Sequence, residues 1–70
     1  MNWYKIDGTL VSKCGNIIFQ IEHYEDDYSL FDVTEGKSLI GVKRELSACK
    51  SLARTYIKNV VRNKVDLELV

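Results

Sequence analysis

The sequence predicts a small α+β domain in which an antiparallel sheet of three to four strands packs on one long helix and a short strand ends the chain. Three observations carry this prediction. The chain has 70 residues, which suits a single domain spanning residues 1–70. All four glycines lie in the first 41 residues, so the turns belong to the first half. Apolar residues alternate there and later recur every three or four residues, which predicts the order β-β-β-α-β.

Three runs of residues have the pattern of strands. Apolar Ile17, Phe19 and Ile21 share one face of the first run, with polar side chains on the other. The runs are residues 17–24, 28–33 and 39–43, separated by a polar break at 25–27 and a glycine-containing turn at 34–38. Connections this short favour an antiparallel meander.

Residues 3–13 allow two interpretations. Asp7-Gly8 is a strong signal for a two-residue hairpin turn. Alternatively, the segment is one bent strand with a bulge at Gly8, which leaves Trp3 among the mostly outward odd positions. We favour the bent strand because a tight hairpin would mix the two faces. The bent strand places four even positions on one face, namely Tyr4, Ile6, Leu10 and Cys14.

The second half of the chain predicts an amphipathic helix that stops near Asn63. Its apolar positions follow helical spacing without a gap: Leu46, Cys49, Leu52, Ala53, Tyr56, Ile57 and Val60. Residues 65–70 then alternate strictly, which predicts a strand whose apolar face carries Val65, Leu67 and Leu69. Such a strand can return to an edge of its own sheet or join the sheet of a second copy as a homodimer.

Charge divides the chain into two halves although the formal net charge is zero. Residues 1–36 carry two basic and seven acidic side chains, a net charge of −5, and residues 37–70 carry +5. The basic half contains a helical row with a spacing of four: Lys50, Arg54, Lys58 and Arg62. This row is either a solvated helix face or an anion-binding face for nucleic acid or an acidic protein.

The acidic half contains a tract that is either a solubilising turn or a protein-binding patch. Its members are Glu25, Asp26, Asp27, Asp32 and Glu35. The tract lacks the D-x-D-x-D-G spacing of a calcium loop. One histidine and two separated cysteines are too few for a zinc site, so we expect no metal and no cofactor.

No nucleophile, base and orienting acid stand in a recognisable arrangement, and no phosphate-binding loop is present. We therefore expect a non-catalytic protein, with His23 structural and both Cys14 and Cys49 reduced and buried. No run of 18 apolar residues and no secretory signal occur, which predicts a cytoplasmic protein of the producing or infected cell, with no membrane partner.

Three antiparallel strands followed by a helix resemble in outline the DNA-binding domains of integrase N-termini and of plant transcription factors. Those domains lay a basic sheet in the major groove, whereas the strand region here is acidic. The length and charge division are also similar to short phage and mobile-element proteins that block a host protein. We thus expect a protein-interaction module, an inhibitor or accessory factor of this kind, whose partner is a protein. The alternative is a nucleic-acid-binding domain that uses the basic row.

Overall fold

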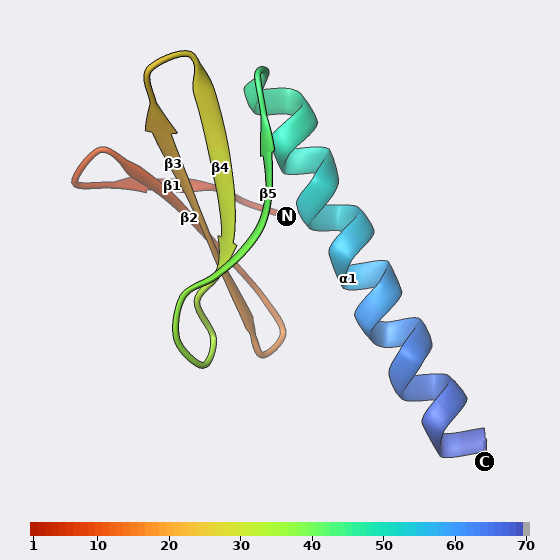
Figure 1. The fold of residues 1–70 in the computed structure, drawn as a ribbon. Coiled ribbons are helices and arrows are strands. Elements are labelled where there is room, and N and C mark those ends of the chain that lie inside the picture. Colours follow the sequence, from red (N-terminus) through yellow and green to blue (C-terminus); the bar gives the residue numbers. More distant parts are fainter. Residues whose placement is uncertain (70) are drawn as a thin grey trace.

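The computed structural model describes the backbone of residues 1–69 and the side chains of residues 1–61 (Figure 1). It has an α+β fold, as predicted, but with five strands rather than three or four. The elements are β1 (Tyr4–Ile6), β2 (Thr9–Cys14), β3 (Ile17–Tyr24), β4 (Asp27–Asp32), β5 (Ser38–Lys43) and α1 (Leu46–Leu69). The strands form one antiparallel sheet in the order β1-β2-β3-β4-β5, so each strand pairs with its neighbour in sequence.

The first hairpin shows that the bent-strand prediction for residues 3–13 is wrong. Asp7 and Gly8 both have positive φ, 51° and 81°, which is the backbone of a type I′ turn. The two-residue turn pairs Ile6 with Thr9, so even positions before the turn share a face with odd positions after it. Tyr4 therefore lies on the opposite face of the sheet from Leu10. The mixed faces are tolerated because β1 is exposed on both sides.

The core lies on one face of the sheet, between β3, β4 and α1. Its buried hydrophobic residues are Phe19, Ile21, Leu30, Cys49 and Ala53. The alternation of β3 places Gln20 and Glu22 on the opposite, outer face, which no helix of the described chain covers. This is the two-layer arrangement that the sequence predicted.

The N-terminal residues cover the part of the core face that α1 does not reach. The Trp3 ring lies 6.4 Å from that of Phe19, and Phe19 meets Tyr56 of α1 edge-on at 5.7 Å. The Ser12 hydroxyl donates a 2.6 Å hydrogen bond to the carbonyl of Asn2, which fixes the segment on β2. Trp3 is thus half-buried and packs against the core, contrary to its predicted outward position.

α1 packs closely on β5 because of a glycine. A Cβ atom on Gly41 would lie 2.7 Å from Cδ2 of Leu52, so any larger residue at this position would have to displace the Leu52 side chain. The pairing of β4 with β5 is irregular next to this glycine. Leu30 pairs with Gly41 but Phe31 pairs with Leu39, so Ile40 is an extra residue that forms a β-bulge.

The predicted terminal strand is wrong, because α1 continues through Leu69 and Val70 lies outside the described residues. Asn63 does not end the helix, since no glycine or proline interrupts it and each added residue gains a hydrogen bond without new nucleation. The alternation at Val65, Leu67 and Leu69 is compatible with helix, and their side chains lie outside the described part. The final turns run past the sheet (Figure 1), and no helix in the described residues is long and apolar enough to cross a membrane.

Candidate functional site

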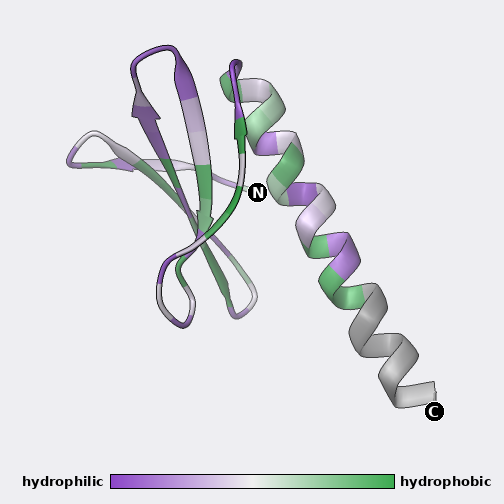
Figure 2. Ribbon diagram, in the orientation of Figure 1, coloured by the Kyte–Doolittle hydropathy of each residue, from purple (hydrophilic) through white to green (hydrophobic). Residues whose placement is uncertain are grey.

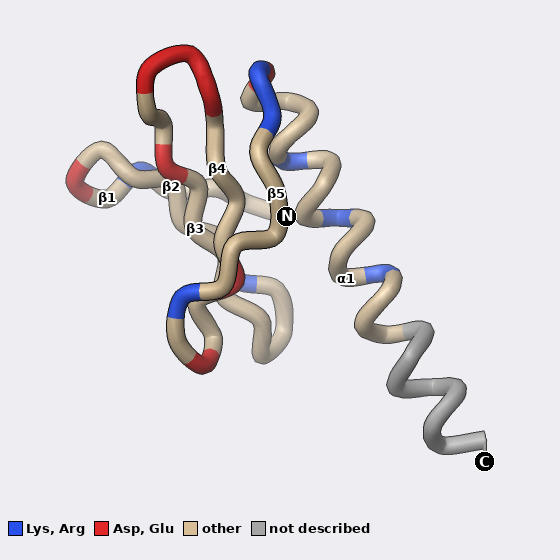
Figure 3. Tube along the Cα trace, in the orientation of Figure 1, with Lys and Arg blue, Asp and Glu red and all other residues tan. Residues whose placement is uncertain are grey.

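The structure divides the predicted acidic tract between opposite ends of the sheet. Glu25, Asp26 and Asp27 lie at the β3–β4 turn, whereas Asp32 is the last residue of β4 at its far end and Glu35 lies in the loop that follows (Figure 3). Asp27 and Asp32 are the first and last residues of β4, so residues 28–31 of the extended strand separate the two groups. The tract therefore does not form one patch, and each half has to be considered by itself.

Asp32 is a structural carboxylate that joins the sheet to the helix. It accepts hydrogen bonds from the Thr34 backbone N–H at 3.0 Å, the Thr34 hydroxyl at 2.6 Å and the Tyr56 hydroxyl at 2.7 Å. Burial raises the pKa of Asp32, but these bonds outweigh it, and the pKa lies below its ordinary value. The hydrogen bond to Asp32 is also the main reason that the pKa of Tyr56 is raised.

A cavity of about 360 Å³ opens beside this carboxylate, lined by the β4–β5 loop and by Tyr56 and Val60 of α1. Its acidic groups are Asp32 and Glu35. Asp32 already has three hydrogen-bond donors, so the arrangement is that of a link between elements rather than of an open binding group.

The basic row is present on α1 as far as the side chains are described. Arg54 and Lys58 are exposed and Lys50 is half-buried, and they follow one side of the helix (Figure 3). Arg54 donates to the Ser51 hydroxyl at 2.9 Å. Among the described side chains, none of these three cations has a carboxylate within ion-pair distance. The Arg62 side chain lies outside the described residues.

His23 lies on the same face as Ile21, as predicted, and is exposed at the end of β3. Its ring stacks on that of Tyr28 at 4.2 Å with an interplanar angle of 12°. Cys49 is buried, and burial raises its thiol pKa against the opposing effect of Lys43. Cys14 is only half-buried, so its predicted full burial is wrong. In residues 1–61 we find no group of three or more potential metal ligands.

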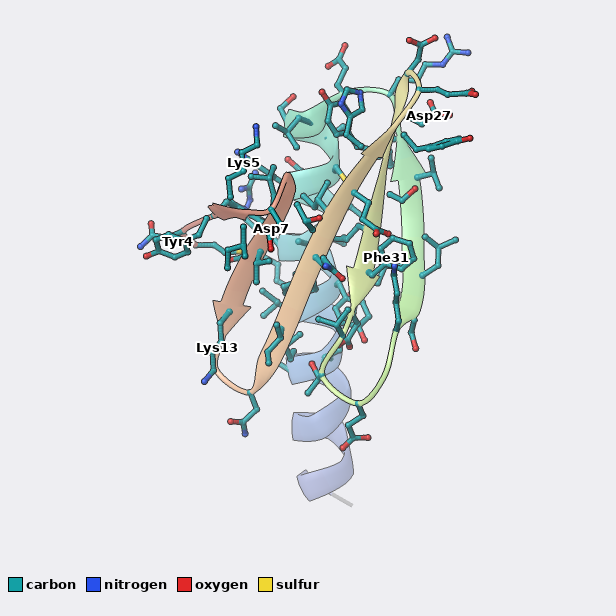
Figure 4. The ribbon with its side chains drawn as sticks, turned by 90° about the vertical axis from the view of Figure 1, so that its left-hand side faces the viewer. Tyr4, Lys5, Asp7, Lys13, Asp27 and Phe31 are labelled. Atoms are coloured by element: carbon teal, nitrogen blue, oxygen red, sulfur yellow. The ribbon has the colours of Figure 1, made fainter. Side chains whose placement is uncertain are left out.

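The outer face of the sheet carries an exposed apolar surface that sequence reasoning missed. Figure 4 views this face, with α1 behind the sheet. One register row crosses all five strands: Tyr4, Val11, Gln20, Phe31 and Leu39. Tyr4 and Leu39 are 62% and 59% exposed, and Ile6 and Val42 on the same face are 57% and 47% exposed. Apart from Tyr24 at the end of β3, the large exposed apolar residues of this face therefore lie on the outer strands.

The centre of the outer face is polar by comparison. Gln20 and Glu22 of β3 occupy it, and Lys37 forms a 2.8 Å ion pair with Glu22. The same ammonium lies 4.4 Å from the centroid of the Phe31 ring. A polar strip on β3 thus separates the apolar side chains of β1 from those of β4 and β5.

The β5 strand adds an unpaired edge to this surface. No strand of residues 1–69 pairs with its outer side. The stretch Ser38–Val42 carries no charge, and β5 is apolar over most of its length in Figure 2. An unpaired, uncharged edge strand presents backbone donors and acceptors that another strand can satisfy.

Sequence reasoning missed this surface because it depends on register. A strand was expected at 39–43, but its position at the edge of the sheet follows only from the five-strand order. The hairpin at Asp7-Gly8 was the available signal that Tyr4 and Ile6 would reach the outer face.

We compared the chain with protein-family models, with curated protein sequences and with solved structures, and none of them matches it.

Proposed function

We propose that this chain is a non-catalytic protein-interaction module whose docking surface is the outer face of the sheet together with the β5 edge. The observation that carries the proposal is the exposure of Tyr4, Ile6, Leu39 and Val42 on one uncovered face. A solvated sheet face normally alternates to polar residues, and large exposed apolar patches mark interaction sites. The partner is a protein that offers a complementary apolar surface.

The biological role that fits this module is that of an inhibitor or accessory factor of a phage or mobile element, acting on a host protein in the cytoplasm. Small size, the division of charge between the halves of the chain and a docking face outside any catalytic arrangement support this role. The charge division orients a partner during encounter, while the apolar face supplies most of the affinity.

The test of the docking face compares three tagged chains in capture from nuclease-treated lysate of the producing cell. The outer-face variant combines Tyr4→Ser with Phe31→Ser, which leaves β5 unchanged. The control variant combines Arg54→Glu with Lys58→Glu on α1. We expect the outer-face variant to lose the partner and the control variant to retain it. Retention by the outer-face variant would contradict the proposal.

A second candidate function is nucleic-acid binding by the basic row. It is favoured by the absence of carboxylate partners around Lys50, Arg54 and Lys58 among the described side chains. Phosphate binding by three cations would weaken steeply with salt, by roughly a factor of 10 or more between 50 and 200 mM. If this function holds, nuclease treatment releases the captured material and the double reversal at Arg54 and Lys58 abolishes capture.

A further inference from the structure

We infer that a second copy of this chain pairs with the β5 edge, antiparallel across a two-fold axis, so that two five-stranded sheets form one ten-stranded sheet. Both α1 helices then lie on the same face of that sheet. The inference rests on the proposed function only in treating β5 as a docking edge. The predicted homodimer instead paired a strand formed by residues 65–70. The helical backbone of Val65, Leu67 and Leu69 excludes that pairing.

The two edges of the sheet differ in their capacity to pair. β1 has three residues, and its middle residue is charged Lys5. β5 has six residues, and charge enters only at Lys43, its last position. Short edge strands and edge lysines are devices that discourage pairing, and β5 lacks both over Ser38–Val42. The β5 edge is therefore the one that a further strand can extend.

An antiparallel pairing centred between Ile40 and Gly41 matches the faces of the two copies. It places Leu39 opposite Val42 of the second copy, and both residues belong to the outer face, since they pair with Phe31 and Ser29 of β4. The same register places Ser38 opposite Lys43, and both belong to the helix face. Leu39 and Val42 occur twice around the axis, so the contact is self-complementary.

This pairing also explains where the exposed apolar residues lie. In one copy they occupy the margins of the outer face, and the polar strip of β3 occupies its centre. In the pair, Phe31, Leu39 and Val42 of both copies become the centre, and the two β3 strands become a polar rim. An apolar centre with a polar rim is the usual anatomy of a protein interface, which a further partner can then contact.

The helix is turned so that its uncharged flank faces the β5 edge. Leu52 on one flank lies over Gly41 of β5, whereas Leu46 on the other flank lines a cavity with Leu10 of β2. At 100° per residue, the flank beyond Leu52 carries Ala48, Thr55 and Asn59, which are small or uncharged. Of the basic row, Lys50 lies on the opposite side of the helix, and each further step of four residues turns the row about 40° toward this flank.

In the pair the two helices lie on either side of the β5–β5 junction. α1 contacts β4 and β5, and Leu52 lies over Gly41 of the edge strand. Because both helices lie on the same face of the joined sheet, their Leu52 flanks face each other across the junction. The side chains of these flanks are short or uncharged, and short side chains allow helices to approach closely.

The exposed area of the chain is also large for its mass. The chain exposes 5325 Å², compared with about 4,500 Å² for a compact monomer of this size. The surplus of about 800 Å² is comparable with what each partner buries in a standard protein interface.

The test is sedimentation equilibrium of the full chain from 5 to 500 µM. We expect a monomer–dimer equilibrium that Leu39→Glu or Val42→Lys each weakens at least tenfold, because each substitution occurs twice around the axis and replaces an apolar cross-strand pair by a charge that faces an aliphatic side chain. The matched control is Ile6→Lys on β1, which is exposed to a similar degree and should leave the equilibrium unchanged. Circular dichroism checks that each variant remains folded.

The combined variant Leu39→Glu with Val42→Lys tests the register itself. In the proposed pairing each introduced carboxylate faces an introduced ammonium of the other copy, so dimerisation should return to within about fivefold of the original. A wild-type chain that is monomeric at 500 µM, equal weakening by Ile6→Lys, or no recovery in the combined variant would overturn the inference. Loss of the dimer with partner capture intact would leave the proposed function standing.

Discussion

The two edge strands of the sheet, β1 and β5, expose similar apolar side chains but differ in their capacity to pair with another strand. Both β1 and β5 present large aliphatic side chains to solvent, Ile6 on one and Leu39 and Val42 on the other. β1 is a three-residue strand exposed on both faces, held by one tight turn. β5 is six residues long and is backed by α1 through the contact between Gly41 and Leu52. Exposure is shared by the two edges, but length and rigid support are not.

The largest expected effect is on the free energy of unfolding, and it distinguishes β4, which pairs with β5 under the helix, from β1. Leu30 is fully buried where β4 and β5 meet the helix, and Leu30→Ala should destabilise the protein by about 2–5 kcal/mol through a cavity. Ile6→Ala on β1 should change stability by about 0.5 kcal/mol or less, as is usual for exposed positions. Urea unfolding of both variants measures this, and equal effects would contradict the difference in support.

A smaller effect is expected from the helix contact that supports β5. Gly41→Ala forces its new Cβ against Leu52 and should cost about 1–3 kcal/mol, the usual range for overpacking. Adding Leu52→Ala removes the clashing methyl group, so the double variant should be more stable than the sum of the single effects indicates. A double-mutant cycle by chemical unfolding checks this. Strict additivity of the two substitutions would show that the helix does not press on Gly41.

The hydrogen bond between Asp32 of β4 and Tyr56 of α1 should make the free energy of unfolding depend on pH. The pKa of Asp32 is below its unfolded value of 3.8, so its ionised form stabilises the fold above that pH. This contribution is lost as the pH falls through the lowered pKa. Tyr56→Phe removes one donor and should cost about 1–2 kcal/mol at pH 7 and less in acid. Unfolding at pH 7 and at pH 2.5 measures this, with Tyr24→Phe, 75% exposed, as the unaffected control.

The smallest expected effect concerns the two thiols. Cys14 is half-buried at the end of β2, whereas Cys49 is buried under the helix with a raised pKa. A thiol reagent at pH 8 should therefore label Cys14 at least tenfold faster than Cys49 in the native protein, because the thiolate reacts and needs access. Mass spectrometry of the labelled peptides checks the order. Faster labelling of Cys49 would contradict the packing of α1 on the sheet.

The sequence was sufficient to predict the elements that depend on local pattern. The alternation around Phe19 and Ile21 correctly predicted β3 and its buried face, and the spacing from Leu46 to Val60 correctly predicted the packed part of α1. Both signals are strong because burial repeats along the element itself.

The failures came where distant contacts or competing patterns decide. The Asp7-Gly8 dipeptide signalled a hairpin turn, but the apolar residues at even positions on both sides of it favoured a single bent strand. The turn that forms places Tyr4 on the outer face. The alternation after Asn63 fits a strand, but the chain is already helical there and helix propagation requires no new partner. The outer surface could not be predicted because it depends on which strand ends the sheet.

Hydrogen exchange of the β5 amides at two protein concentrations tests most directly whether β5 is the docking edge of this protein. Amides that point away from β4 have no partner in one copy and should gain at least tenfold protection between 5 and 500 µM. The β1 amides, on the opposite edge, should exchange at the same rate at both concentrations. Exchange in β5 that does not depend on concentration, or equal protection of β1, would contradict the account.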